Sequence, residues 1–359
     1  MTTRAHRKPV PVTPELRERA AAVHRSAIVI DGMCTDHIED PHNKLRWNEP
    51  YLQRLFDGGI TALNRGGAHY QRFADGVKAI RKFQLRAQHC PERTIFVRSA
   101  DDIRRAKREG KVGIIAGFQT SVVIEDDVDY VEALYAVGAR CMQITYNERC
   151  NVGDGCQERN PAGLSHFGID VVKEMNRVGL VVDLAHVSDA TAREAAALST
   201  RPVIVSHSAC GGLRPNPRSA TDELIRLVAR SGGVIGICFL PFLLDPDGRT
   251  RCTFEDFLRH IDHVVDLVGV DHVGFGTDLT EEINPTEMMT ETGELGNWPN
   301  KPYRPVVYPP LPWIFPPEID SLAKMGNITL GLLARGYSDE DARKIMGGNF
   351  LRVFGEVWR

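Results

Sequence analysis

The sequence predicts an α/β fold in which a single (β/α)8 barrel of the TIM type uses the whole chain. Eight apolar, strand-like runs alternate with helix-length segments that are amphipathic or charged. Continuous apolar strands separated by helices are typical of parallel strands that are buried on both faces. Eight such units favour a closed barrel over an open sheet. The runs are AIVIDG, GITALN, VGIIAGFQ, ARCMQITYN, LVVDLAH, PVIVSHS, GVIGICFL and HVGFGTD.

The segments between these runs supply the expected helices. DYVEALYAVG and HFGIDVVKEMNRVG each end in the glycine that often follows a helix C-terminus. We expect an N-terminal helix at about 13–26 and a closing helix at 339–359. Long loops follow the first and eighth runs, at about 36–56 and 282–317, where insertions usually form lids or pocket walls. No internal boundary is visible, so residues 1–359 are predicted to form one domain.

Composition excludes several classes of partner. The formal net charge of -3 gives no basic excess, so neither nucleic acid nor a membrane surface is expected as a partner. The first residues lack the apolar stretch of a signal peptide, and no segment is long and apolar enough to span a bilayer. The eight cysteines are scattered without a CxxC pair, which is typical of reduced thiols in a cytoplasmic protein.

Polar side chains gather where the strands end, and in a barrel these ends meet at one rim. Two neutral imidazoles suit zinc, and a nearby carboxylate can accept a proton from water, so His186, His207 and Asp278 predict a metal-hydrolase site. A single histidine would more often be a satisfied core residue, but two at the ends of consecutive strands favour a site. The rim residues are Asp31, Asn64, Gln119, Tyr146, Asn147, His186, His207 and Asp278.

The other histidines lack this placement. His260 and His263 fall on an expected helix and His272 begins a strand, so surface or capping roles are expected for them. His37 and His42 fall in a rim loop and stay open as candidates.

Three segments resemble the membrane dipeptidase (renal dipeptidase) family of zinc peptidases. They are GLSHFGIDVVKEMNRVGLVVDLAHVSD, PVIVSHSACGGLRPNPRSATDELIRLVARSGGVIGI and DHVGFGTDLTEE. The resemblance covers the chain from about residue 114 onward and implies that His186 and His207 bind one zinc of a two-zinc site. It also implies that Arg218 holds the substrate carboxylate, that Asp278 takes part in proton transfer, and that the protein is a homodimer.

The chain departs from the family pattern after the first strand. The family has His-x-Asp directly after DG, whereas this chain has DGMCTD, with Met33 and Thr35 at those places. A shift by one residue would supply Cys34 and Asp36 instead, and a thiolate with a carboxylate is an acceptable zinc ligand pair.

Two further departures lie in the middle of the chain. The family's bridging glutamate after the third strand is missing, since GIIAGFQTS offers only Ala116 and Gln119. Tyr146 stands where the family has a substrate-polarising histidine, and a tyrosine can still donate a hydrogen bond to an oxyanion. These losses indicate a rebuilt site with one zinc ion per chain, with two or none as the open alternatives.

The sequence therefore predicts a dipeptidase-like metallohydrolase that cleaves the amide bond of a dipeptide or a small N-acyl amino acid. Asp278 would accept the proton, Tyr146 would stabilise the oxyanion, and Arg218 and Asn147 would bind a substrate with a free carboxylate. His186 and His207 would hold the metal, with Cys34, Asp36 or Asp278 as further ligands. Other chemistry on a small carboxylate, such as a different amide hydrolysis or an elimination, and a non-catalytic barrel that binds a small acid are the alternatives.

Overall fold

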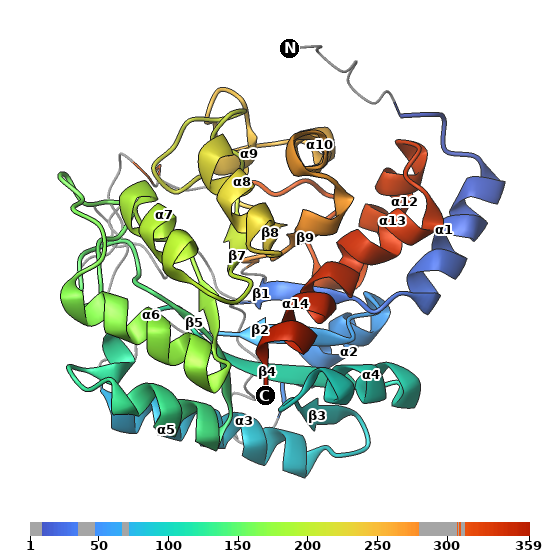
Figure 1. Ribbon diagram of the computed structural model, residues 1–359. Coiled ribbons are helices and arrows are strands. Elements are labelled where there is room, and N and C mark those ends of the chain that lie inside the picture. Colours follow the sequence, from blue (N-terminus) through green and yellow to red (C-terminus); the bar gives the residue numbers. More distant parts are fainter. Residues whose placement is uncertain (1–8, 35–46, 67–71, 280–306, 308, 310–312) are drawn as a thin grey trace, which may run out of the picture.

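The computed structural model describes residues 9–34, 47–66, 72–279, 307, 309 and 313–359 (Figure 1). Eight parallel strands follow one another in the order β1-β2-β4-β5-β6-β7-β8-β9 and form a nearly closed barrel with helices outside, which confirms the predicted fold. Each of the eight apolar runs supplies one of them. Their bounds are β1 Ile30–Cys34, β2 Ala62–Arg65, β4 Val112–Phe118, β5 Ala139–Gln143, β6 Val181–Asp183, β7 Ile204–Ser208, β8 Val234–Ile237 and β9 Val273–Phe275.

A seam between β9 and β1 brings the first and last strands together. The backbone N–H of Asp278 donates to the carbonyl of Met33 at 3.0 Å. Just before it, the N–H and the hydroxyl of Thr277 both donate to the carboxylate of Asp31, at 2.8 and 2.7 Å. The residue that ends the eighth run is therefore fixed by hydrogen bonds to the first strand.

A ninth strand, β3 (Thr94–Phe96), was not expected from the sequence. It pairs with the first residues of β4, Val112 to Ile114, whereas β5 pairs with β4 only from Ala116 onward. The strand therefore extends the sheet beside β4 before β5 begins. Its three residues are too short a run to show any periodicity, which is why the sequence gives no signal for it.

The helices lie outside the strands (Figure 1). Helix α1 lies where the N-terminal helix is predicted, and α5 and α6 occupy the two predicted segments DYVEALYAVG and HFGIDVVKEMNRVG. Helices α7, α8 and α10 occupy other helix-length segments between the apolar runs. The described helices are α1 Pro14–Ser26, α2 Glu49–Asp57, α3 Phe73–His89, α4 Ala100–Glu109, α5 Asp129–Val137, α6 His166–Val178, α7 Asp189–Leu198, α8 Asp222–Arg230, α9 Pro241–Leu244, α10 Phe254–Val268, α12 Gly326–Ala334, α13 Asp339–Arg343 and α14 Asn349–Val357. Among them, none is long and apolar enough to cross a membrane.

Helix α2 corrects the expected loop at 36–56. The side chain of Asn48 accepts a hydrogen bond from the Tyr51 N–H at 3.1 Å and caps the helix, and Tyr51, Leu52 and Leu55 are buried on one face. An N-cap asparagine followed by proline in the first turn is the signal that could have revealed this helix. Residues 35–46 and most of the loop at 282–317 lie outside the described residues.

The predicted closing helix is interrupted. A π-helical segment, Lys344–Gly348, separates α13 from α14. A Cβ atom at Gly347 would lie 2.5 Å from the carbonyl oxygen of Ile28 and 2.7 Å from the Ile30 nitrogen, so only glycine allows this close approach to β1. The buried ring of Phe350 on α14 then lies against Gly32, Gly236 and Gly274 of the strands. The interruption thus lets α14 pack closely against the barrel (Figure 1).

Candidate active site

Two histidine side chains meet inside the barrel. His207 belongs to β7, and His186 follows β6 in a turn. Their Nε2 atoms lie 2.9 Å apart, and their ring planes are inclined by 58°. Both residues are buried, with exposures of 3% and 0%. Two lone pairs cannot face each other at this distance, so a proton or a cation must lie between the two nitrogens.

The opposite nitrogen of each ring is also held. Nδ1 of His186 lies 2.7 Å from the Oδ1 atom of Asn147, which also accepts a hydrogen bond from the Cys156 thiol at 3.3 Å. Because Oδ1 is an acceptor, His186 carries its proton on Nδ1 and turns an Nε2 lone pair toward His207. Nδ1 of His207 lies 2.7 Å from the hydroxyl of Ser206, which can donate or accept.

Electrostatics keep this histidine pair uncharged. Burial, reinforced by the positive charge of Arg218, holds the pKa of both imidazoles well below the usual range, so both are neutral at pH 7. Burial also raises the pKa of Asp278 to about 6, and the charge of Arg218 opposes this rise. Its Oδ2 atom lies 3.9 Å from Nε2 of His207. The structure thus brings three of the predicted site residues together around Arg218, which is only 3% exposed.

Two buried aspartates fix the strand ends that carry these side chains. Oδ1 of Asp183 accepts hydrogen bonds from the N–H of Ala185 at 3.1 Å and of Ser206, on the next strand, at 2.9 Å. Oδ1 of Asp31 likewise accepts hydrogen bonds from the N–H of Met33 at 3.1 Å and from the N–H of Thr277 at 2.8 Å. Burial raises the pKa of both carboxyls, for Asp31 to about 7. Asp31 is one of the predicted rim residues, whereas Asp183 is not, and the sequence signal for Asp183 is an acid within an apolar strand.

The backbone is strained at the same place. Asn147, His186 and Asp278 have φ values of 57°, 66° and 49°, in the left-handed region that side chains other than glycine rarely adopt. Only one other non-glycine residue, Glu125, has a positive φ in the part of the chain that the structure describes. Strain of this kind tends to gather at functional sites, where the surroundings hold it in place. Here three of the four strained residues belong to the predicted site.

Tyr146 and Arg218 flank the histidine pair. The ring of Tyr146 stacks on that of His186, with 4.0 Å between the ring centroids and planes inclined by 24°. The backbone of Arg218 is held by Asn216 Oδ1 at 2.8 Å and by the Ser208 hydroxyl at 3.0 Å. Together with Asn147, which contacts His186, they are the three residues that the sequence associates with substrate.

A model of the family described as membrane dipeptidase (peptidase family M19) matches residues 17–290 of the chain. The chain belongs to this family. The resemblance stated from the sequence is thereby confirmed, together with the expectation of a dipeptidase-like metallohydrolase.

Individual relatives agree with this assignment. The chain is 28% identical to dipeptidase verJ of Clonostachys rogersoniana over 81% of its length and 67% of the relative. It is 28% identical to dipeptidase tcpJ of Claviceps purpurea over 80% of its length, but over only 61% of that relative. An amidohydrolase from Pseudomonas aeruginosa of known structure is 34% identical, with a TM-score of 0.83 over 94% of this chain and 99% of that one. The chain thus spans about two thirds of the length of the curated relatives, and nearly all of the solved one.

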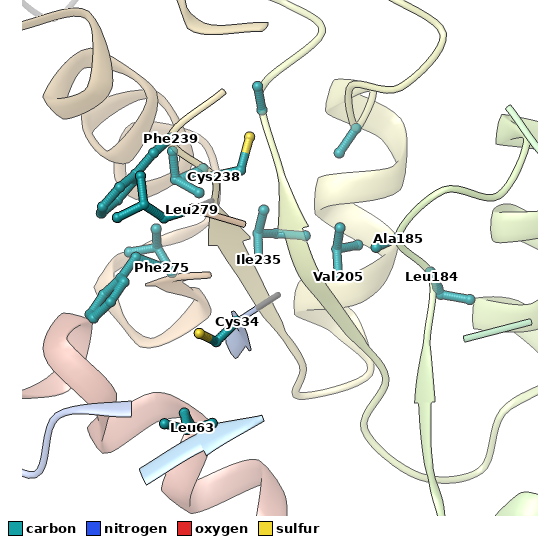
Figure 2. Close-up of a cluster of buried hydrophobic side chains, with 14 of the residues drawn as sticks. Cys34, Leu63, Leu184, Ala185, Val205, Ile235, Cys238, Phe239, Phe275 and Leu279 are labelled. Carbon is teal, nitrogen blue, oxygen red and sulfur yellow. The ribbon is translucent and has the colours of Figure 1, made fainter. Parts of the chain in front are cut away.

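The structure describes the surroundings of Gln119 and Cys34, two residues at which this chain departs from the family pattern. Gln119 reaches the pair, with Nε2 3.5 Å from Nε2 of His207. The Cys34 thiol lies 3.0 Å from the Tyr51 hydroxyl. Figure 2 shows Cys34 within a buried apolar cluster that includes Leu63 and Phe275. Asp36 lies outside the described residues.

The donor set fits a metal in part. Two neutral imidazole nitrogens converge, and their rings are fixed from behind by oxygen atoms, as is usual for histidines that bind zinc. At zinc–nitrogen distances of about 2.0–2.1 Å, tetrahedral ligands lie roughly 3.3 Å apart, so the two Nε2 atoms, now 2.9 Å apart, would have to separate slightly to hold zinc between them. Within the described residues, no group of three or more histidine, cysteine, aspartate or glutamate side chains is arranged to hold a metal.

His260 differs from the surface role expected for it. The residue is buried, its Nδ1 accepts from the Cys210 N–H at 2.9 Å, and its Nε2 lies 3.3 Å from the Leu244 carbonyl. Burial lowers its pKa to about 4, although the bond to Leu244 opposes this. His263 and His272 contact Asp222 and the Gly233 carbonyl, in keeping with capping roles. His37 and His42 lie outside the described residues.

This buried imidazole predicts a loss of stability in acid. The pKa of His260 is lower in the folded protein than the ordinary 6.5. The stabilisation that the neutral ring gives to the folded state is therefore complete above pH 6.5 and is lost as the pH falls toward 4. The free energy of unfolding of the wild type, measured with urea, should fall relative to His260→Gln by up to about 3 kcal/mol between pH 7 and pH 4. The matched control is His89→Gln, at an exposed position. A difference between wild type and His260→Gln that does not vary with pH would contradict this reading.

Proposed function

We propose that this protein hydrolyses the amide bond of a dipeptide or a small N-acyl amino acid with a free carboxylate, using one zinc ion. The observation that carries the proposal is the approach of His186 Nε2 and His207 Nε2 to 2.9 Å, with both Nδ1 atoms held. Two neutral imidazole nitrogens that converge in this way support a role as two ligands of one small cation. A zinc ion at this place would supply Lewis acidity toward the scissile carbonyl and toward water.

One metal ion accords with the charge around the pair better than two. Two divalent cations close together need bridging anions, but this chain has neutral Gln119 next to His207 and Ala116 on β4. A catalytic zinc usually has three protein ligands. The third ligand would be Cys34 or Asp36 if Asp278, whose Oδ2 atom lies 3.9 Å from Nε2 of His207, acts as the base, and Asp278 itself if it does not.

The other residues of the site would bind and orient the substrate and would transfer a proton. Arg218 would hold the substrate carboxylate with its guanidinium fork. Asp278, whose pKa of about 6 leaves it mostly ionised at pH 7, would accept the proton of the attacking water. The hydroxyl of Tyr146 would donate to the oxyanion. Asn147, predicted to bind substrate, would also fix the tautomer of His186, because its Oδ1 accepts the Nδ1 proton.

Two finer expectations belong to the same proposal. None of the eight cysteines forms a disulfide bond in the structure, which supports a reducing compartment such as the cytoplasm. The homodimer follows from the family resemblance alone, and size-exclusion chromatography with light scattering would test it.

A substrate panel tests the proposal itself. Purified protein reconstituted with zinc should hydrolyse dipeptides or N-acyl amino acids, with the release of a free amino acid as the readout. Turnover of other small carboxylates, with neither class of amide cleaved, would favour the alternative of different chemistry in a rebuilt site.

Replacing Asp278 by asparagine should slow hydrolysis. The change keeps the size of the side chain and removes the basic oxygen, so kcat should fall by about 10²–10⁴-fold, the usual contribution of a positioned base. The exposed Asp247→Asn variant serves as the matched control and should keep full rate. A wild-type rate in Asp278→Asn would mean that another group accepts the proton, with Asp36 as the next candidate.

Replacing Arg218 by methionine should remove the preference for a free carboxylate. One partner of a charge-assisted pair is then lost, so binding of the free acid should weaken by about 2–5 kcal/mol. An amidated substrate should be turned over poorly by the wild type and should lose little further in the variant. Equal turnover of amidated and free-acid substrates by the wild type would show that Arg218 does not bind a substrate carboxylate.

A further inference from the structure

We propose that Ser206 is a positioning residue, whose hydroxyl links His207 to the buried carboxylate of Asp183 and thereby holds His207 in the form that binds a metal ion. Ser206 and His207 are consecutive residues of β7, and Asp183 ends the neighbouring strand β6 (Figure 1). The inference rests on the proposed function, because it concerns how His207 is prepared to act as a ligand. Ser206 is not among the residues that the sequence assigns to the site.

The side chain of Ser206 can reach both a ring nitrogen and a carboxylate. Its Oγ atom lies 2.7 Å from Nδ1 of His207. Its backbone N–H donates to Oδ1 of Asp183 at 2.9 Å, which fixes Ser206 against that carboxyl. Burial raises the pKa of Asp183, and Ser206 opposes this rise through both its hydroxyl and its N–H. All three residues are at most 1% exposed, so bulk water does not compete for these hydrogen bonds.

Without a metal ion between the rings, the hydroxyl of Ser206 donates to His207. Nδ1 of His186 donates to Oδ1 of Asn147, so the proton between the two rings belongs to Nε2 of His207. A neutral His207 with its proton on Nε2 has a lone pair on Nδ1, and this lone pair accepts from the Ser206 hydroxyl. In keeping with this direction, Oδ2 of Asp183 is buried and has no hydrogen-bond partner among the described residues.

A metal ion on Nε2 of His207 requires the opposite direction. The neutral ring then carries its proton on Nδ1, so Nδ1 becomes a donor and Oγ of Ser206 must accept. The hydroxyl of Ser206 can then turn toward Oδ2 of Asp183, the buried acceptor that otherwise lacks a partner. The ring stays neutral, because the Nε2 proton leaves and Nδ1 takes one up. Ser206 therefore reverses its hydrogen bond, and the chain from Nδ1 through Oγ to the carboxylate makes the imidazole a better ligand.

The zinc affinity of the full chain, measured by competition with a chelating indicator, tests this link. Ser206→Ala removes only the hydroxyl, and Asp183→Asn keeps the size of the side chain but offers a donor in place of an acceptor. Either change should raise the Kd for zinc by about 10–100-fold, the usual effect of losing the partner of a metal-binding histidine. The matched control is Ser208→Ala, the buried serine on the other side of His207, whose hydroxyl donates to the Arg218 carbonyl. Its Kd should stay unchanged.

The position of the proton on His207 is a readout that a purely structural role of Ser206 would not change. Nitrogen-15 NMR of protein labelled in its histidine rings should show this proton on Nε2 without metal and on Nδ1 with zinc in the wild type. The Ser206→Ala, Asp183→Asn double variant should bind zinc no more weakly than the weaker single variant, because both changes break the same link. Thermal unfolding midpoints check that each variant is folded.

The outcomes separate this inference from the proposed function. If the wild type binds no zinc, the proposed function fails and the reversal fails with it. If the wild type binds zinc and Ser206→Ala binds it equally tightly, the zinc site stands and the link through Ser206 is wrong. A proton that stays on Nδ1 of His207 with and without zinc would also overturn the reversal. If Asp183→Asn is destabilised, Ser206→Ala and the NMR measurement decide alone.

Discussion

The site depends on two buried carboxylates that link neighbouring strands. Asp183 joins the end of β6 to β7, and Asp31 joins the end of β1 to the residues after β9, in each case through backbone N–H groups. Burial disfavours their charge, and the pKa of about 7 for Asp31 shows how large this cost is. The hydrogen bonds of the two carboxylates fix the backbone conformation at the ends of the strands. This conformation determines the positions of His186, His207 and Asp278.

Because the strand ends are fixed, His186 and His207 are held with their Nε2 atoms facing each other, and both rings are neutral. Left-handed backbone at His186 and Asn147 turns the two side chains together, and Asn147 then selects the tautomer of the imidazole. Burial and the charge of Arg218 keep both imidazoles neutral, which is the form that binds a metal. A cation between the two Nε2 atoms would take the place of a proton there, so metal binding would be coupled to proton release. The chemistry of the site therefore comes from the backbone as much as from the side chains.

Most of the barrel and the histidine pair could be predicted from the sequence. The features that could not be predicted were missed for physical reasons. The eight barrel strands were visible because buried parallel strands are continuous apolar runs, and His186 and His207 because each ends such a run. Strand β3 is too short to show a period, and α2 is a nine-residue helix whose main sequence signals are its caps at Asn48 and Gly58. The partners of Asp183 and the strain at His186 depend on which strands become neighbours. No local pattern encodes this.

Metal content per chain tests the central claim most directly. The wild type, dialysed against a weak chelator and then reconstituted with zinc, should contain about one zinc ion per chain by elemental analysis, as three protein ligands with one open position would hold. The double variant His186→Ala, His207→Ala should contain almost none. Cys34→Ser should bind zinc more weakly only if Cys34 is a ligand. A value near two in the wild type would show that a complete second half-site exists, and a value near zero would contradict the metallohydrolase mechanism.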